Sequence, residues 1–339
     1  MRWKLLGLIV TAGLIAPVLA TQASGRERRV DRECRREVVR LCGIQRSGIR
    51  ACLQDRADAL SEGCKMQFVQ AIANRRGAGP GAPATDVQAT TVPYGNDPRQ
   101  AVDIYLPEQD RPTAGYPLIV YIHGGGWRNG NRSMVQGKPD FFMRKGWAFA
   151  SAGYRLLPEV PVEQQAEDVA AALRKLVAES RALGIDPDRI VIMGHSAGAH
   201  LAALVATDPD YLKADMARIK GVILLDGAAY DVARQMQDQP LIAKQLYTPA
   251  FGTAPARQAR LSPITHSAAP NAGQWLIMHV ANRKDAAVQS NALGAALRAA
   301  GSRADVRSVE GENHMTINRN LGAEDNAHTR AVTAFLAAF

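Results

Sequence analysis

The chain has 339 residues, and 47% of them are hydrophobic, so it can bury a large core and is not expected to be intrinsically disordered. Its formal net charge of +9 comes mostly from residues 26–76, which carry 13 basic and 7 acidic side chains. Residues 77–339 carry 26 basic and 25 acidic side chains, and this near-neutral balance argues against binding to nucleic acid.

The first twenty residues have the organisation of a secretory signal peptide. A short basic start, Met1–Lys4, precedes an uncharged apolar stretch, Leu5–Ala20, that ends in small residues. We therefore expect cleavage after Ala20, followed by export to the periplasm of a bacterium or secretion from it. An uncleaved membrane anchor is the alternative, but sixteen residues that include Pro17 barely span a bilayer.

All four cysteines lie within 31 residues, in a segment with helical periodicity, residues 26–76: Cys34, Cys42, Cys52 and Cys64. An exported segment this short needs cross-links to hold a fold, so we predict a small helical module with two disulfides. A metal site is disfavoured because the segment has no histidine and no CxxC pair. Two antiparallel helices would favour nested bridges, Cys34–Cys64 and Cys42–Cys52. The module is expected to be a structural appendage or to dock on the envelope or a protein partner.

Beyond a linker, residues 77–89, that is rich in glycine, alanine and proline, strand-like apolar runs alternate with helical ones up to residue 339. The expected strands are 101–107, 117–123, 147–156, 190–196, 221–227, 274–280 and 304–309. Continuous apolar runs are typical of strands buried on both faces, and residues 162–184 predict a long amphipathic helix that ends at Gly184. Residues 90–339 are therefore expected to form a three-layer α/β sandwich with a mostly parallel central sheet.

Ser196 lies in Gly194-His195-Ser196-Ala197-Gly198, between a predicted strand and a predicted helix. A nucleophilic serine on a tight strand-to-helix turn needs this context, because a Cβ at either glycine would clash with the strand or the helix. The beginning of the helix also favours the negative charge that develops during acyl transfer. A small residue needed only for packing is the alternative, and the context favours a nucleophile.

A second motif, His123-Gly124-Gly125-Gly126-Trp127, directly follows a predicted strand. Consecutive glycines leave backbone N–H groups unobstructed, so they can bind an oxyanion. The expected donors are the N–H groups of Gly125, Gly126 and Ala197. His123 precedes the serine motif and is expected to brace this loop.

Together these motifs make residues from about 90 to 339 resemble an α/β-hydrolase of the carboxylesterase type with an HGGG loop. This group includes hormone-sensitive-lipase-like esterases, feruloyl and acetylxylan esterase-like enzymes, and kynurenine formamidases. The resemblance rests on "HGGGW", "GIDPDRIVIMGHSAGAHLAAL" and "NHMTI", which occur in the expected order. It implies the chain order serine, acid, histidine. His314 is then the base, because it follows the last predicted strand and precedes one closing helix.

The acid departs from the family pattern. The family has Asp or Glu just past the strand 274–280, where this sequence has Asn282 and Arg283. We expect Asp285 to be the acid, delivered by a slightly longer loop, although it could instead cap the following helix. Asp226, at the end of the preceding predicted strand, is the reserve, and Asn282 could orient His314 without charge.

These residues predict a carboxylic ester hydrolase that needs no metal and no organic cofactor. Trp127, beside the glycine loop, would narrow the acyl side and favour short acyl groups. Residues 228–272 form either a cap over Ser196 or an ordinary helical connection. Two other functions stay open: an arylformamidase, and a catalytically silent hydrolase fold that only binds a partner.

Overall fold

The computed structural model describes residues 32–42, 61, 64, 88–323 and 325–339. The chain divides into two compact units, Met1–Pro80 and Gly81–Phe339. The predicted signal peptide, most of the predicted linker and the predicted Cys42–Cys52 bridge lie outside the described residues. Within the described residues no helix has the length and apolar character needed to cross a membrane.

The described part of the first unit is built around helix α1 (Arg32–Cys42) and one disulfide. Cys34 is bonded to Cys64, with 5.0 Å between their Cα atoms, as the nested arrangement predicts. The Glu37 carboxylate accepts hydrogen bonds from the N–H and the hydroxyl of Ser61. These contacts fasten Ser61 and Cys64 to the helix, which confirms the Cys34–Cys64 bridge of the predicted helical module.

The second unit is organised around an eight-stranded sheet with the strand order β1-β2-β4-β3-β5-β6-β7-β8. The strands are β1 (Thr90–Pro93), β2 (Ala101–Tyr105), β3 (Tyr116–Ile122), β4 (Ala148–Ala152), β5 (Ile185–His195), β6 (Ile219–Leu225), β7 (Gln274–Val280) and β8 (Arg303–Val309). Strand β2 is antiparallel to both of its neighbours, β1 and β4. The six strands β3 to β8 are all parallel to one another. The parallel strands therefore all end at one edge, where ligands bind in such sheets.

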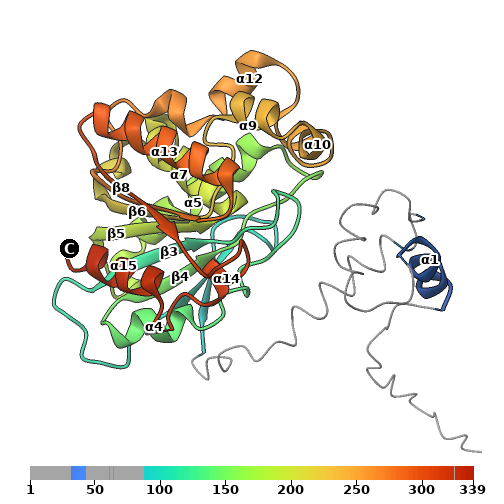
Figure 1. Cartoon of the computed structure of the whole chain (residues 1–339). Coiled ribbons are helices and arrows are strands. Elements are labelled where there is room, and N and C mark those ends of the chain that lie inside the picture. The colour runs from blue at the N-terminus through green and yellow to red at the C-terminus, as the bar shows by residue number, and fades with distance from the viewer. Residues whose placement is uncertain (1–31, 43–60, 62–63, 65–87, 324) are drawn as a thin grey trace, which may run out of the picture. The chain divides into compact units, whose positions relative to one another are not determined.

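Helices cover both faces of this sheet (Figure 1). One face carries α5 (Val162–Ala178), α7 (Ala197–Thr207) and α13 (Lys284–Ala299), and the other carries α4 (Lys138–Arg144) and α15 (Ala327–Leu336). Shorter helices are α6 (Ser180–Leu183), α8 (Pro209–Leu212), η2 (Lys213–Arg218) and α14 (Thr316–Arg319). This is the predicted three-layer sandwich. The helix predicted over residues 162–184 is divided in two, because α5 ends at Ala178 and α6 begins at Ser180; Gly184 ends α6 in a left-handed conformation, with φ 72°.

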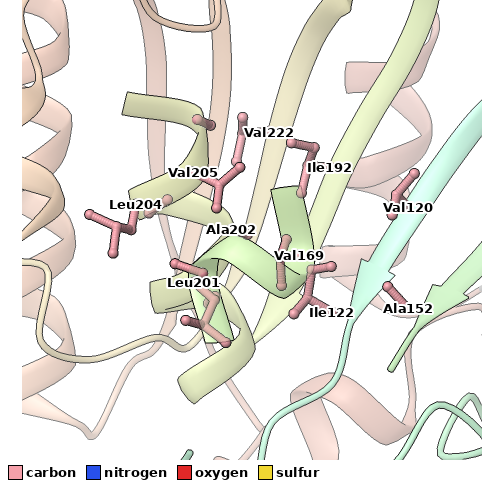
Figure 2. Close-up of a cluster of buried hydrophobic side chains, with 14 of the residues drawn as sticks. Val120, Ile122, Ala152, Val169, Ile192, Leu201, Ala202, Leu204, Val205 and Val222 are labelled. Atoms are coloured by element: carbon pink, nitrogen blue, oxygen red, sulfur yellow. The ribbon is translucent and has the colours of Figure 1, made fainter. Parts of the chain in front are cut away.

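The core that positions the site lies between the sheet and α7. All eleven residues of α7 are buried, because the sheet, α5 and neighbouring segments enclose this helix on all sides. Figure 2 shows its side chains packed against those of the strands and α5, among them Val120, Ile122, Val169, Ile192, Leu201, Leu204, Val205 and Val222. Alanines on α7 allow it to approach the sheet closely, and the first turn of this helix is thereby fixed.

Two segments differ from a simple sandwich. Strand β1 was not predicted, because only one of its four residues is buried and it has no apolar run. Residues 228–272, named here the cap segment, connect β6 to β7 through a series of short helices rather than one long one. These are α9 (Val232–Asp238), α10 (Pro240–Ile242), the π-helix η3 (Ala243–Tyr247), α11 (Thr248–Phe251), α12 (Pro255–Arg260) and η4 (Pro263–His266).

Candidate active site

Ser196 lies at the sharp turn between β5 and α7, with backbone angles φ 56° and ψ −122° that non-glycine residues rarely adopt. The two flanking glycines are required by space. A Cβ at Gly194 would collide with the carbonyl oxygen of Gly198. A Cβ at Gly198 would collide with the carbonyl oxygens of Ile122 and His123. The turn therefore holds the serine hydroxyl out from the carboxyl end of the strand.

His314 contacts this hydroxyl from the loop that follows β8. Its Nε2 lies 3.0 Å from Ser196 Oγ, within hydrogen-bonding distance. The backbone carbonyl of His314 accepts a 2.7 Å hydrogen bond from His195 Nε2, and the two imidazole rings lie 4.7 Å apart. Burial and the nearby His314 lower the pKa of His195 to about 3, so His195 stays neutral and serves as a fixed donor.

Asp226 lies on the other side of the imidazole, at the end of β6. Its Oδ2 is 2.7 Å from His314 Nδ1, and its Oδ1 accepts a 3.0 Å hydrogen bond from the N–H of Val280. Burial raises the pKa of this carboxyl, but the hydrogen bond with His314 and the charge of Arg283 outweigh it and lower the pKa to about 2. Asp226 is therefore ionised and can hold the Nδ1–H tautomer of His314.

Asp285 does not reach His314, contrary to the expectation from the sequence. It lies in the first turn of α13, where its Oδ2 is 2.9 Å from Arg283 Nη2 and 3.5 Å from Gln235 Nε2. Arg283 lies between Asp285 and the His314 imidazole and contacts both. Helix α13 already begins at Lys284, so there is no longer loop that could bring Asp285 to His314. Asn282 is exposed, and among the described residues it makes no hydrogen bond to His314.

The glycine loop lies against the serine turn. A Cβ at Gly124 would lie 3.0 Å from the Cβ of Ser196, and Gly125 and Gly126 have φ values of 133° and 61° that favour glycine. Among the described residues, no acceptor binds the N–H groups of Gly125, Gly126 or Ala197. The N–H of Ala197 has no partner within its own helix because it belongs to the first turn. These donors are available to an oxygen of a bound substrate.

His123 braces the glycine loop. Its ring stacks on Tyr154 with 4.3 Å between ring centroids, and the Tyr154 hydroxyl donates a 2.8 Å hydrogen bond to the His123 carbonyl. Burial lowers the pKa of His123 to about 4, so the ring is neutral at physiological pH. Its Nδ1 lies 2.9 Å from the carbonyl oxygen of Gly124. His123 thus has the bracing role that the sequence predicted, rather than that of a catalytic base.

Trp127 is buried and does not itself form an open wall of the site. Its indole N–H donates to His200 Nδ1 over 3.3 Å, and its ring packs against Tyr247 and Phe251 of the cap segment. The cap segment is thereby anchored beside the glycine loop. From η3, Leu246 reaches the loop, where its Cδ1 lies 2.8 Å from the position that a Cβ on Gly126 would occupy.

The residues missed by sequence reasoning are therefore Leu246, the donor His195 and the bridging Arg283. Only Arg283 carried a local signal, since it stands where the family pattern has an acid. No cluster of three or more metal-ligating side chains occurs within the described ranges. The arrangement of hydroxyl, imidazole and carboxylate is suited to nucleophilic acyl transfer.

Comparison with known proteins gives the same fold. The chain matches the model of the BD-FAE family over residues 102–292, which is more than half of its length. Esterase LipC of Mycobacterium tuberculosis is 34% identical over 130 residues, covering 37% of this chain and 32% of LipC. The kynurenine formamidase of Danio rerio is 29% identical over 161 residues, covering 47% of this chain and 50% of that protein. This chain thus spans half or less of these two curated relatives.

Among solved structures, esterase B of Lactobacillus rhamnosis is 23% identical, with a TM-score of 0.67 over 81% of this chain and 93% of that one. This likeness shows the α/β-hydrolase fold, in agreement with the eight-stranded, mostly parallel sheet. With that fold and a family match over more than half of its length, the chain belongs to the BD-FAE family.

Proposed function

We propose that this protein is a serine-dependent hydrolase of carboxylic esters with short acyl groups. The observation that carries the proposal is one continuous line of hydrogen bonds, from Ser196 Oγ through His314 to the Asp226 carboxylate. The named esterases among its relatives support the same activity. In this proposal Ser196 is the nucleophile, His314 the general base and Asp226 the triad acid.

In the first step, Ser196 Oγ attacks the ester carbonyl carbon while His314 Nε2 accepts the hydroxyl proton. The negative oxygen of the tetrahedral intermediate is bound by the N–H groups of Gly125, Gly126 and Ala197. The imidazolium then gives its proton to the leaving oxygen. An alcohol departs, and the acyl group remains as an ester of Ser196.

In the second step, water releases the acyl group by the reverse sequence of proton transfers. His314 accepts a proton from water as the water oxygen attacks the acyl carbon. The bond between that carbon and Ser196 Oγ breaks, and the imidazolium returns the proton to Oγ. A carboxylic acid leaves, and neither step requires a metal or an organic cofactor.

A second candidate, an arylformamidase, is favoured by the similarity to kynurenine formamidase. The same serine, histidine and oxyanion donors would attack a formamide carbonyl, so the two candidates differ in the substrate rather than in the machinery. A formyl group is also the smallest acyl group and fits a restricted acyl site. Comparing N-formylkynurenine with p-nitrophenyl acetate as substrates of one preparation distinguishes them.

The test is hydrolysis of p-nitrophenyl acetate, butyrate and octanoate by the unchanged protein and by Ser196→Ala. We expect turnover that is fastest for acetate and falls to the non-enzymatic rate in Ser196→Ala, with an unchanged circular-dichroism spectrum. Ser308→Ala, at an exposed serine on β8, is the matched control and should keep full activity. If no substrate is turned over, or if Ser196→Ala retains turnover, the proposal is wrong and a binding role remains.

A further inference from the structure

The guanidinium of Arg283 joins two carboxylates, and one of them belongs to the proposed triad. Its Nη1 lies 2.5 Å from Asp226 Oδ2 and 2.8 Å from His314 Nδ1, and its Nη2 lies 2.9 Å from Asp285 Oδ2. The Asp226 side chain is fully buried, whereas those of Arg283 and Asp285 are 25% and 15% exposed. The arginine therefore touches the triad from the solvent side.

This contact has two opposite physical effects on His314. Arg283 Nη1 binds one oxygen of the Asp226 carboxylate and the N–H of Val280 binds the other, so the two contacts together hold Asp226 with Oδ2 facing the imidazole. The same fixed positive charge lies next to an imidazole that must itself become positive during catalysis. It also competes with Nδ1–H for the same carboxylate oxygen.

The negative charge of Asp285 offsets the positive charge that Arg283 places beside His314. Its carboxylate binds the far nitrogen of the guanidinium, so it holds the fork in place and places a negative charge beside it. Burial alone would lower the pKa of Arg283, but the charges of Asp226 and Asp285 raise it. The arginine thus stays charged between two carboxylates.

We propose that Arg283 and Asp285 are positioning residues of the hydrolytic site: Arg283 holds the Asp226 carboxylate against His314, and Asp285 anchors Arg283 and offsets its charge. This inference rests on the proposed function, because it assigns a role only where His314 takes up a proton. The remaining ionisable groups nearby are His195 against the His314 ring, Lys138 behind His195, and the hydroxyls of Tyr230 and Tyr247 near Asp226 and Arg283.

These neighbours do not mask the expected effects. Burial raises the pKa of Tyr247 to about 12 and also raises that of Tyr230, so both stay neutral where esterases are assayed. His195 stays neutral down to acidic pH. Burial lowers the pKa of Lys138 to about 7, so Lys138 titrates within the assayed range, but it does so in the unchanged protein and in every variant alike. The charges of Arg283 and Asp285 are therefore the ones that differ between the variants and should move the titration of His314.

Single substitutions should shift the acid limb of the pH profile in opposite directions. Without a positive charge beside it, the imidazole is protonated more readily, so Arg283→Met should move the acid limb of kcat/KM up by about one pH unit. It should also lower kcat about 10- to 100-fold, because the Asp226 carboxylate loses its anchor. Asp285→Asn leaves the arginine charge uncompensated and should move the acid limb down, by roughly half a pH unit.

The variant Arg283→Lys separates the effect of the positive charge at residue 283 from the effect of the contact with two carboxylates. A lysine keeps the positive charge but has one nitrogen, so it cannot bridge Asp226 and Asp285 as a fork does. We expect Arg283→Lys to keep the acid limb close to that of the unchanged protein and to leave kcat reduced. The matched control is Arg307→Met, which breaks an arginine–aspartate pair at the same two-residue spacing, with Asp305, on the half-exposed surface of β8.

The experiment measures kcat and kcat/KM for p-nitrophenyl acetate from pH 5 to 9 in all five proteins. It is paired with a ¹⁵N nuclear magnetic resonance titration of His314, which needs no substrate. Opposite shifts of the His314 midpoint in Arg283→Met and Asp285→Asn, with no shift in Arg307→Met, support the inference. Equal or parallel shifts, or an unchanged kcat in Arg283→Met, overturn it.

The two readouts separate this inference from the proposed function. If the unchanged protein hydrolyses no ester but the His314 midpoint still moves as expected, the proposed function fails and the electrostatic roles of the pair stand. If Ser196-dependent hydrolysis is present and the midpoint does not move, the inference fails alone. If Arg283→Met does not fold, Asp285→Asn and Arg283→Lys still decide it.

Discussion

At the scale of single residues, the site depends on an aspartate at an unusual place in the chain. Asp226 follows β6, whereas the family pattern has its acid after the next strand, β7, where this chain has Arg283. Asp226 adopts a left-handed backbone conformation with φ 45°, and its N–H binds the carbonyl of Met278 over 2.7 Å. This strained turn places the carboxylate beside the imidazole, so in the proposed function the end of β6 supplies the acid that the family pattern has after β7.

Replacing Asp226 with asparagine should therefore be far more damaging than the same change at Asp285. An amide cannot hold the Nδ1–H tautomer of His314, so Asp226→Asn should lower kcat by about 10⁴-fold. Asp285→Asn should lower kcat at the optimal pH less than about tenfold, because Asp285 acts only through Arg283. Steady-state kinetics of the two isosteric variants make the comparison. A larger loss of kcat in Asp285→Asn than in Asp226→Asn would instead identify Asp285 as the triad acid.

At the scale of elements, the cap segment packs against the glycine loop beside Ser196. Trp127 and His200 both pack against Phe251 of this segment, and His200 Nε2 also binds the Leu261 carbonyl over 2.8 Å. The π-helix η3 projects Leu246 over Gly126, next to the proposed oxyanion donors. If the proposed preference for short acyl groups holds, we expect Leu246 to impose it rather than Trp127, which is buried.

Shortening Leu246 should widen the range of acyl groups. Leu246→Ala removes the side chain that contacts the loop, so the ratio of butyrate to acetate turnover should rise about tenfold, the low end of the effect of one methylene in a hydrophobic pocket. Comparing kcat/KM across the p-nitrophenyl ester series measures this ratio. Leu241→Ala, at an 89% exposed position of α10, is the control and should leave it unchanged. An unchanged ratio in Leu246→Ala would place the restriction elsewhere.

At the scale of the whole molecule, three buried neutral histidines connect the site to the stability of the fold. His123 braces the glycine loop, His195 holds the His314 loop, and His200 binds Trp127 and the Leu261 carbonyl. Burial lowers the pKa of His123 and His200 to about 4, and burial together with His314 lowers that of His195 to about 3. Protonation of any of them therefore costs free energy of folding.

The second unit should therefore lose stability steeply on mild acidification. The ordinary histidine pKa of 6.5 lies above the folded values, so the unfolded chain binds more protons between about pH 4 and 6.5. The free energy of unfolding should fall as pH drops through this window, by up to about 4 kcal/mol per pH unit for three histidines. Urea denaturation at pH 7.0 and 5.5 measures the difference. Equal stabilities at both pH values would contradict it.

The sequence predicted most of the sheet, because buried parallel strands leave continuous apolar runs such as residues 118–122. It also predicted which serine and which histidine meet, since a glycine-flanked turn and a late histidine both have local signals. The acid was different. Asp226 was only the reserve, named because it ends a predicted strand; it lies 88 residues from His314 in the chain, and the contact depends on the order of β6 and β7 in the sheet. Leu246 depends likewise on how a loop folds back.

The central claim is that Ser196 is a nucleophile activated by His314 and Asp226. Labelling with phenylmethanesulfonyl fluoride, followed by mass spectrometry of the digested protein, tests it most directly, because the serine oxygen displaces fluoride and retains the sulfonyl group. We expect a single adduct on the peptide that contains Ser196, none in Ser196→Ala, and labelling slowed at least a hundredfold in Asp226→Asn. An adduct elsewhere, or equal labelling rates in the unchanged protein and in Asp226→Asn, would contradict the claim.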